Sequence, residues 1–173
     1  MQPWNLSPVV DPRCRCPLHE RPTRAGHRRP GSVGVVELEG HLEELFDAAA
    51  AVRERAHSPY SRYPVGAAIR TVEGDLFVGC NVENAAFPEG TCAEAGAIAA
   101  MVAGAGPTAR IAEILTVAGG ARPGSPCGGC RQKIREFATP ETRIVSTTPG
   151  AAAIGWTMAE LLPGGFGPDD LPV

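Results

Sequence analysis

The sequence predicts an α/β fold in which helices pack on the faces of one sheet of about five strands. Two observations lead to this prediction. Segments whose apolar residues recur at helical spacing alternate along the chain with short apolar runs of strand length. The 173 residues are also enough for one domain with a substantial core, and they contain no internal repeat.

The first elements predicted are a helix and a hairpin. Apolar residues at helical spacing predict a helix over residues 37–56; they are Leu38, Leu42, Leu45, Ala49 and Val52. Ser58-Pro59 ends this helix, because a residue before proline avoids helical dihedral angles. Residues 65–71 and 76–81 are then the two strands of a hairpin that turns at Glu73-Gly74-Asp75.

Two further helices flank the next strand. Pro88-Glu89-Gly90 breaks the chain, and Thr91 is the expected N-cap of an alanine-rich helix over residues 92–102. The apolar run 111–118 predicts a buried strand, and a helix is expected from the Cys127 region to Phe137.

The C-terminal part predicts two more strands and a short helix. Residues 143–147 and 152–156 are the strands, on either side of a turn at Pro149-Gly150. The short helix covers residues 157–162 and ends before Pro163. Strands and helices therefore alternate through this part of the chain as well.

The first 35 residues have a different composition from the rest. They hold six prolines, six arginines and only two acidic residues, so their charge is about +4 and that of the remainder about −7. Because no helical or strand period survives this proline content, residues 1–35 are predicted to be a disordered basic extension, with the folded domain spanning 36–173. The extension is either a tail that binds nucleic acid or another partner, or an upstream segment without function. The lack of aromatic residues interleaved with its arginines favours the second interpretation.

Composition also narrows the function classes. A net charge of −3 gives no support for a polyanionic partner, so nucleic-acid binding is not expected. No apolar run approaches the roughly 18 residues of a membrane span, and the start shows no secretory signal, so no membrane association is expected. We therefore expect a cytoplasmic protein, in which cysteines are more often metal ligands or core residues than disulfides.

Two cysteine motifs carry the chemistry. Cys92-Ala93-Glu94 is followed by Pro126-Cys127-Gly128-Gly129-Cys130. Three thiolates fill three of the four tetrahedral positions of a zinc ion and leave the fourth open to water, and a nearby carboxylate can move that water's protons. Both motifs begin predicted helices, whose N-terminal N–H groups and dipoles lower thiol pKa values. The pattern therefore favours a hydrolytic zinc site.

The alternative is a closed structural zinc module with Cys80 as a fourth thiolate. Structural sites usually combine two Cys-x-x-Cys pairs, and this part of the sequence has only one. Cys80 ends a predicted strand, where a free cysteine is commonly a small buried hydrophobe. The sequence therefore favours the catalytic site.

Five blocks carry a resemblance to a known family; they are residues 58–68, 81–84, 92–94, 126–132 and 161–168. Together they resemble the small, zinc-dependent, homotetrameric class of cytidine deaminases, and the cysteine and glutamate signature is shared by zinc deaminases in general. The resemblance implies a three-layer α/β/α architecture with a mixed sheet. It also implies hydrolytic deamination of cytidine or 2′-deoxycytidine in pyrimidine salvage, with a nucleoside substrate, a homotetramer and one zinc ion per subunit.

The resemblance also implies roles for individual residues. Cys92, Cys127 and Cys130 match the zinc ligands, and Glu94 matches the proton shuttle. The implied substrate contacts are Asn81 and Glu83 with the ribose hydroxyls, Tyr63 (a phenylalanine in the family) stacked on the pyrimidine, the backbone at Ala93 and Pro126 with the base, and Phe166 in the cavity of a neighbouring subunit.

Ala95 is a departure from the family pattern. Many members with three cysteines have an arginine directly after the catalytic glutamate, hydrogen-bonded to the thiolates. With alanine here, Arg131 and the two helix dipoles are left to offset the negative charge of the thiolates. We hypothesise that zinc is still bound and that the pKa of its water is higher than in relatives with the arginine.

Two other enzymatic functions remain open at this point. One is deamination of another cytosine nucleoside, such as an aminoacylated nucleoside antibiotic; the ribose pair Asn81 and Glu83 favours a plain nucleoside instead. The other is deamination of a polynucleotide, which only the basic extension supports and which the acidic core opposes.

Overall fold

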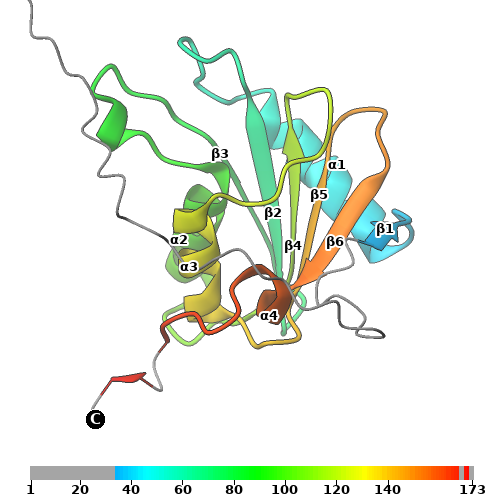
Figure 1. Ribbon diagram of the computed structural model, residues 1–173, viewed down its shortest axis with the longest axis vertical. Helices are drawn as coiled ribbons and strands as arrows, with labels where there is room; N and C mark the ends of the chain where they lie inside the picture. Colours follow the sequence, from blue (N-terminus) through cyan, green and yellow to red (C-terminus); the bar gives the residue numbers. More distant parts are fainter. Residues whose placement is uncertain (1–33, 168–169, 172–173) are drawn as a thin grey trace, which may run out of the picture.

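The computed structural model describes residues 34–167 and 170–171, so the predicted extension lies almost entirely outside the described residues. The elements in chain order are β1 (Gly34–Val36), α1 (His41–Arg53), β2 (Val65–Thr71), β3 (Leu76–Cys80), the 3₁₀ helix η1 (Phe87–Glu89), α2 (Ala93–Ala105), β4 (Ile111–Ala118), α3 (Gly128–Phe137), β5 (Arg143–Thr147), β6 (Ala153–Thr157) and α4 (Met158–Leu161). The described strands form one six-stranded sheet in the order β1-β6-β5-β4-β2-β3 (Figure 1). The predicted α/β fold is confirmed, with one strand more than expected.

Helices cover both faces of the sheet and give the molecule three layers (Figure 1). On one face, Leu45 of α1 belongs to a buried core with Leu115 of β4. On the other face, Ile134 of α3 belongs to a second core with Ile114, the residue before Leu115. Because successive side chains of a strand point to opposite faces, β4 contributes to both cores, which is why apolar residues stand at neighbouring positions such as Ile114 and Leu115.

The N-terminal boundary of the fold differs from the prediction. Residues 37–40 were expected to be helical, but α1 begins at His41, after Gly40, whose φ of 57° lies in the left-handed region that glycine favours. Before this turn, β1 pairs antiparallel with β6 at the edge of the sheet. The expected helix start was therefore wrong, and the sixth strand was missed.

The ends of two helices also differ. α1 ends at Arg53 instead of continuing to residue 56. Cys92, not Thr91, is the N-cap of α2, and this helix continues to Ala105 instead of ending at 102. Cys92 makes no side-chain capping hydrogen bond. Its sulfur is therefore not used for capping and can bind a metal ion.

Gly79 lets α2 lie directly on β3. A Cβ atom at this position would stand 2.2 Å from the backbone nitrogen of Ala97 and 2.6 Å from the carbonyl oxygen of Ala93. Only a residue without a side chain fits such a backbone-to-backbone contact. The contact fixes the helix that begins after Cys92 against the sheet.

β4 and β5 pair in parallel, whereas the other described strand pairs are antiparallel. The buried hydroxyls of Thr116 on β4 and Ser146 on β5 are 2.8 Å apart near the carboxyl ends of these strands. In open α/β sheets, ligands bind beyond the carboxyl ends of parallel strands. Among the described residues, no helix combines the length and the apolar character needed to cross a membrane.

Candidate active site

Three cysteines from two helices meet at one end of the sheet. Cys92 is the N-cap of α2, Cys127 is the N-cap of α3, and Cys130 lies in the first turn of α3. Their sulfur atoms all lie within 4.8 Å of one another, and Sγ of Cys92 is 4.0 Å from Sγ of Cys127. A tetrahedral zinc ion with bonds of about 2.3 Å holds its sulfur ligands about 3.8 Å apart. The donor set and its spacing therefore fit zinc, as predicted.

The protonation of the free thiols depends on their surroundings. Burial raises the pKa of Cys92 and of Cys130. Burial also acts to raise the pKa of Cys127, but the backbone N–H of Cys130 and the two neighbouring thiols outweigh it and lower that pKa overall. The metal-free site therefore holds protons that a zinc ion has to displace.

Cys80 does not join this cluster. It is the last residue of β3, where it pairs with Gly66 of β2, and the metal-binding group found among the described residues contains three cysteines only. The four-thiolate structural module therefore does not form in the described part of the chain. An open position is left at the metal site, as hydrolytic zinc sites require.

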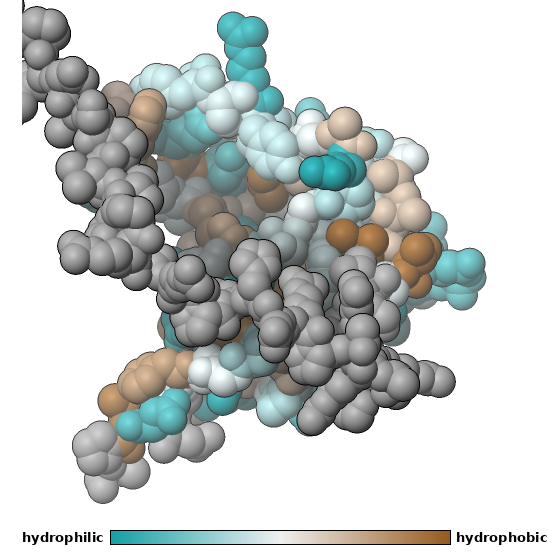
Figure 2. All heavy atoms as spheres, viewed as in Figure 1, coloured by the Kyte–Doolittle hydropathy of each residue, from teal (hydrophilic) through white to brown (hydrophobic). Residues whose placement is uncertain are grey.

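Glu94 lines the same cavity as two of the cysteines, Cys92 and Cys127. This cavity of about 410 Å³ has Cys92, Ala93 and Cys127 in its wall. Glu94 lies in the first turn of α2, and only 6% of its surface is exposed. Figure 2 shows a hollow on this face of the molecule, with hydrophobic residues visible behind a more hydrophilic rim. A buried carboxylate beside an open metal site is placed for proton transfer.

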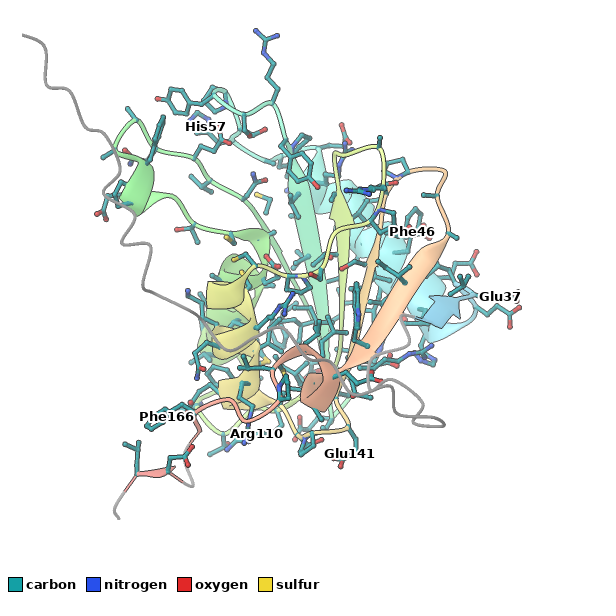
Figure 3. The ribbon with its side chains drawn as sticks, in the orientation of Figure 1. Glu37, Phe46, His57, Arg110, Glu141 and Phe166 are labelled. Carbon is teal, nitrogen blue, oxygen red and sulfur yellow. The ribbon has the colours of Figure 1, made fainter. Side chains whose placement is uncertain are left out.

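Glu83 also lines the cavity and is held by the loop before β2. Its Oε2 accepts hydrogen bonds from the backbone N–H groups of Tyr60 at 2.9 Å and Ser61 at 3.2 Å, and its Oε1 accepts one from the Ser61 hydroxyl. The Ser61 hydroxyl is the main reason why the pKa of Glu83 lies below its usual value, and His57, at the same end of the molecule (Figure 3), acts in the same direction. Glu83 is therefore kept ionised and oriented.

Ser61 was not predicted as a functional residue. It lines the cavity, and its Oγ also accepts the backbone N–H of Tyr63 at 3.0 Å. The intervening Arg62 has a φ of 55°, a left-handed conformation that is uncommon outside glycine. Ser61 stands within the block 58–68, but no spacing rule connects it to a carboxylate 22 positions away.

Both the oxygen and the nitrogen of the Asn81 side-chain amide form hydrogen bonds with the backbone just before and at the start of β2. Its Nδ2 donates to the carbonyl oxygen of Tyr63 at 3.0 Å, and its Oδ1 accepts from the backbone N–H of Val65 at 2.7 Å. One N–H and one lone pair remain for a ligand. Asn81 therefore lines the cavity and also fixes the backbone that carries Tyr63.

Tyr63 forms an aromatic wall of the cavity and is 40% exposed. Its ring packs against Gly120, where a Cβ atom would stand 3.0 Å from a ring carbon. Ala93, fully buried, lines the cavity close to the cysteines. The cavity is thus lined by the predicted site residues other than Cys130 and Phe166; Cys130 is buried, but its sulfur lies within 4.8 Å of the sulfur atoms of Cys92 and Cys127.

Phe166 is the predicted site residue that lies apart from both the cavity and the cysteine cluster. It is 57% exposed, lies beside α3 away from the cavity (Figure 3), and is not among the residues that line it. Ala95 also lies outside the cavity, in a groove between α2 and α3 that includes Gln132 and Lys133. Position 95 therefore contributes no group to the metal site in this chain.

Comparisons with known proteins agree with this geometry. A family model described as the cytidine and deoxycytidylate deaminase zinc-binding region matches residues 40–146. A cytidine deaminase of Sporosarcina psychrophila is 37% identical over 130 residues, which are 75% of this chain and 94% of that protein. The matched range 40–146 contains the three cysteines and Glu94 but not Phe166.

Solved structures extend the likeness to the fold. The crystal structure of a cytidine deaminase from Burkholderia pseudomallei has a TM-score of 0.67 and 39% identity, and the match covers 72% of this chain and 98% of that one. A cytidine deaminase from Mycobacterium leprae has a TM-score of 0.63 and 38% identity, over 72% of this chain and 99% of that one. The described fold is therefore similar to theirs over nearly their full length.

Proposed function

The chain belongs to the family of cytidine and deoxycytidylate deaminases, and on this premise we propose that its cavity hydrolyses cytidine and 2′-deoxycytidine to the corresponding uridine nucleosides and ammonia. One observation carries the proposal: the cluster of three cysteines reaches a cavity through Cys92 and Cys127, and the buried carboxylate of Glu94 lines the same cavity. The protein is thus a zinc-dependent hydrolase. Its reaction returns cytosine nucleosides to the uridine pool, which is a step of pyrimidine salvage.

Glu94 moves the protons of the reaction. When bound, zinc acts as a Lewis acid that lowers the pKa of a water molecule and supplies the nucleophile for C4 of the pyrimidine. Glu94 accepts the proton of that water, delivers it to N3 of the base, and then assists the departure of the exocyclic nitrogen as ammonia. Its burial supports this role, because a carboxylate screened from bulk water passes the proton to the substrate.

Other residues of the cavity hold the nucleoside. Asn81 and Glu83 bind the ribose hydroxyls, with the amide N–H as donor and the ionised carboxylate as acceptor. Tyr63 stacks on the pyrimidine, and the backbone at Ala93 contacts its edge. The position of Glu83 is supported by Ser61, which keeps the carboxylate charged and aimed into the cavity.

The working enzyme is proposed to be a homotetramer in which Phe166 closes the cavity of a neighbouring subunit. Support comes from its exposed ring, and from the exposed pair Tyr60 and Phe87, whose rings stand 6.0 Å apart beside the cavity. Exposed aromatic clusters are typical of interaction surfaces. Light scattering of the wild type measures the assembly. Phe166→Ala is expected to raise KM for cytidine without a change in zinc content, and a monomeric wild type with full activity would contradict this assembly.

The function is tested by ultraviolet monitoring of purified protein with cytidine, 2′-deoxycytidine and free cytosine. Turnover of the nucleosides, loss of turnover with a chelator, and no turnover of cytosine are expected. Turnover that survives complete zinc removal, or a preference for the free base, would overturn the proposal. The proposed division is an extension (1–35) and a deaminase domain (36–173), and a parallel measurement on a truncation that starts at Gly34, so that β1 stays whole, tests whether the residues before the sheet are needed. Location in the cytoplasm remains a prediction from the sequence.

A further inference from the structure

Arg131 directly follows the third cysteine and reaches two separate segments of the chain. Its Nε donates to the carbonyl oxygen of Pro126 at 2.9 Å, and its Nη2 donates to Oγ of Ser125 at 2.8 Å. Its Nη1 donates to the carbonyl oxygen of Leu161, the last residue of α4, at 3.0 Å. Each of the three guanidinium nitrogens therefore has its own oxygen acceptor.

These hydrogen bonds connect the metal site with the C-terminal segment. Ser125 and Pro126 line the cavity and directly precede Cys127. The next residue of α3, Gln132, donates from Nε2 to the carbonyl oxygen of Phe166 at 3.0 Å. The first half of α3 thus fixes the loop before Cys127 on one side and residues 161–166 on the other.

We infer that Arg131 is a positioning residue: its guanidinium fork sets the place of Cys127, and with it the Pro126 wall of the cavity, for the deamination proposed above. The geometry of the fork matters more than its charge, because three acceptors in different directions match the fixed N–H directions of a guanidinium. A lysine keeps the charge but offers a single nitrogen. The consequence for catalysis rests on the proposed function, whereas the consequence for metal binding does not.

Without these hydrogen bonds, the loop before α3 can move next to Cys127, which is one of the metal ligands. Metal–ligand distances tolerate only about 0.2 Å of error. Residues that orient metal ligands typically change metal affinity about 10- to 100-fold when they are replaced. Replacement of Arg131 is expected to lower the metal affinity within this range, although Arg131 is neither a metal ligand nor a residue that lines the cavity.

The test is a Co²⁺ titration of the wild type, Arg131→Met, Arg131→Lys and Arg110→Met. Co²⁺ absorbs in the visible range with an intensity that reports tetrahedral geometry, and its thiolate charge-transfer band reports the sulfur ligands. Arg110→Met is the matched control, since Arg110 also donates to backbone carbonyls, those of Thr108 and Ala109, at the opposite end of the molecule (Figure 3).

Both Arg131 variants are expected to bind Co²⁺ about 10- to 100-fold more weakly, with weaker tetrahedral bands, and Arg110→Met to match the wild type. Wild-type affinity and spectrum in Arg131→Met overturn the inference, and full rescue by Arg131→Lys overturns the claim that geometry outweighs charge. If Arg131→Met does not fold, Ser125→Ala removes one acceptor alone and is expected to weaken Co²⁺ binding about fivefold; an unchanged affinity then overturns the inference.

The metal titration separates this inference from the proposed function. A wild type that binds Co²⁺ through thiolates but does not turn over cytidine overturns the proposed function and leaves the role of Arg131 in metal binding standing. If the wild type deaminates cytidine but the Arg131 variants bind Co²⁺ as tightly as the wild type, the proposed function stands and the role of Arg131 is overturned.

Discussion

Replacing Gly79 by alanine tests whether the contact between β3 and α2 places the active-site helix. The added Cβ atom would stand 2.2 Å from the backbone nitrogen of Ala97, whereas ordinary contact begins at 3.4 Å. α2 therefore has to retreat by about 1.2 Å, the difference between these distances. Because the colliding atoms belong to the backbone, no side-chain rotation relieves the clash.

Both stability and metal binding are expected to fall. Overpacking costs about 1–3 kcal/mol, and a clash with rigid backbone belongs at the upper end, about 3 kcal/mol. For a domain of this size, that corresponds to a melting temperature lower by about 6–12 °C. The same movement displaces Cys92 beyond the tolerance of a metal ligand, so zinc affinity is expected to fall at least about tenfold.

Thermal unfolding followed by circular dichroism and competition for zinc with a chromophoric chelator measure the two effects. Gly96→Ala is the matched control on the other side of the same contact. Its Cβ atom would stand 3.5 Å from the carbonyl oxygen of Cys80, an ordinary distance, and alanine favours the helix by about 0.5–1 kcal/mol. Wild-type melting and zinc affinity in Gly79→Ala would refute the argument that this contact positions Cys92.

Three further outcomes follow from the site. Glu94→Gln is expected to keep the fold and the zinc ion but to lower kcat about 10²- to 10⁴-fold, measured with cytidine; a kcat near that of the wild type would show that another group moves the protons. Ser61→Ala removes the main cause of the lowered pKa of Glu83. The carboxylate of Glu83, which is protonated as the pH falls through this pKa, is therefore expected to become protonated at a higher pH than in the wild type. An NMR titration that shows no upward shift in the pKa of Glu83 would contradict this. Because burial raises the pKa of Cys92 and Cys130, zinc added back to chelated protein at neutral pH is expected to release protons and restore activity, and an indicator dye that reports no proton release would exclude protonated thiols in the metal-free site.

The metal site could be predicted from the sequence because its requirements are local and chemical. Cys92 and Cys127 each stand at the start of a helix, and Cys130 follows within one turn, so three residues and two helix boundaries define the site. Glu94 is fixed by the same helix as Cys92. Long apolar segments such as β4 were predictable for a similar reason, since their length and composition determine their burial.

The features that the sequence did not reveal depend on partners far away in the chain. β1 is only three residues long and exists through its pairing with β6. The hydrogen bonds from Ser61 to Glu83 and from Arg131 to Leu161 span 22 and 30 positions. Periodicity and motif spacing describe local geometry, so such contacts become visible only when the chain is folded.

The position of β1 has a practical consequence for using the protein as an immobilised catalyst. β1 is the edge strand on the side of the sheet opposite β3, whereas the cavity is lined by residues of β2, β4 and α2. A support attached ahead of Gly34 would therefore begin at the edge remote from the cavity and leave its entrance facing the solution. Attachment after Leu171 would begin close to Phe166, where a support would compete with the neighbouring subunit of the proposed homotetramer for the same surface.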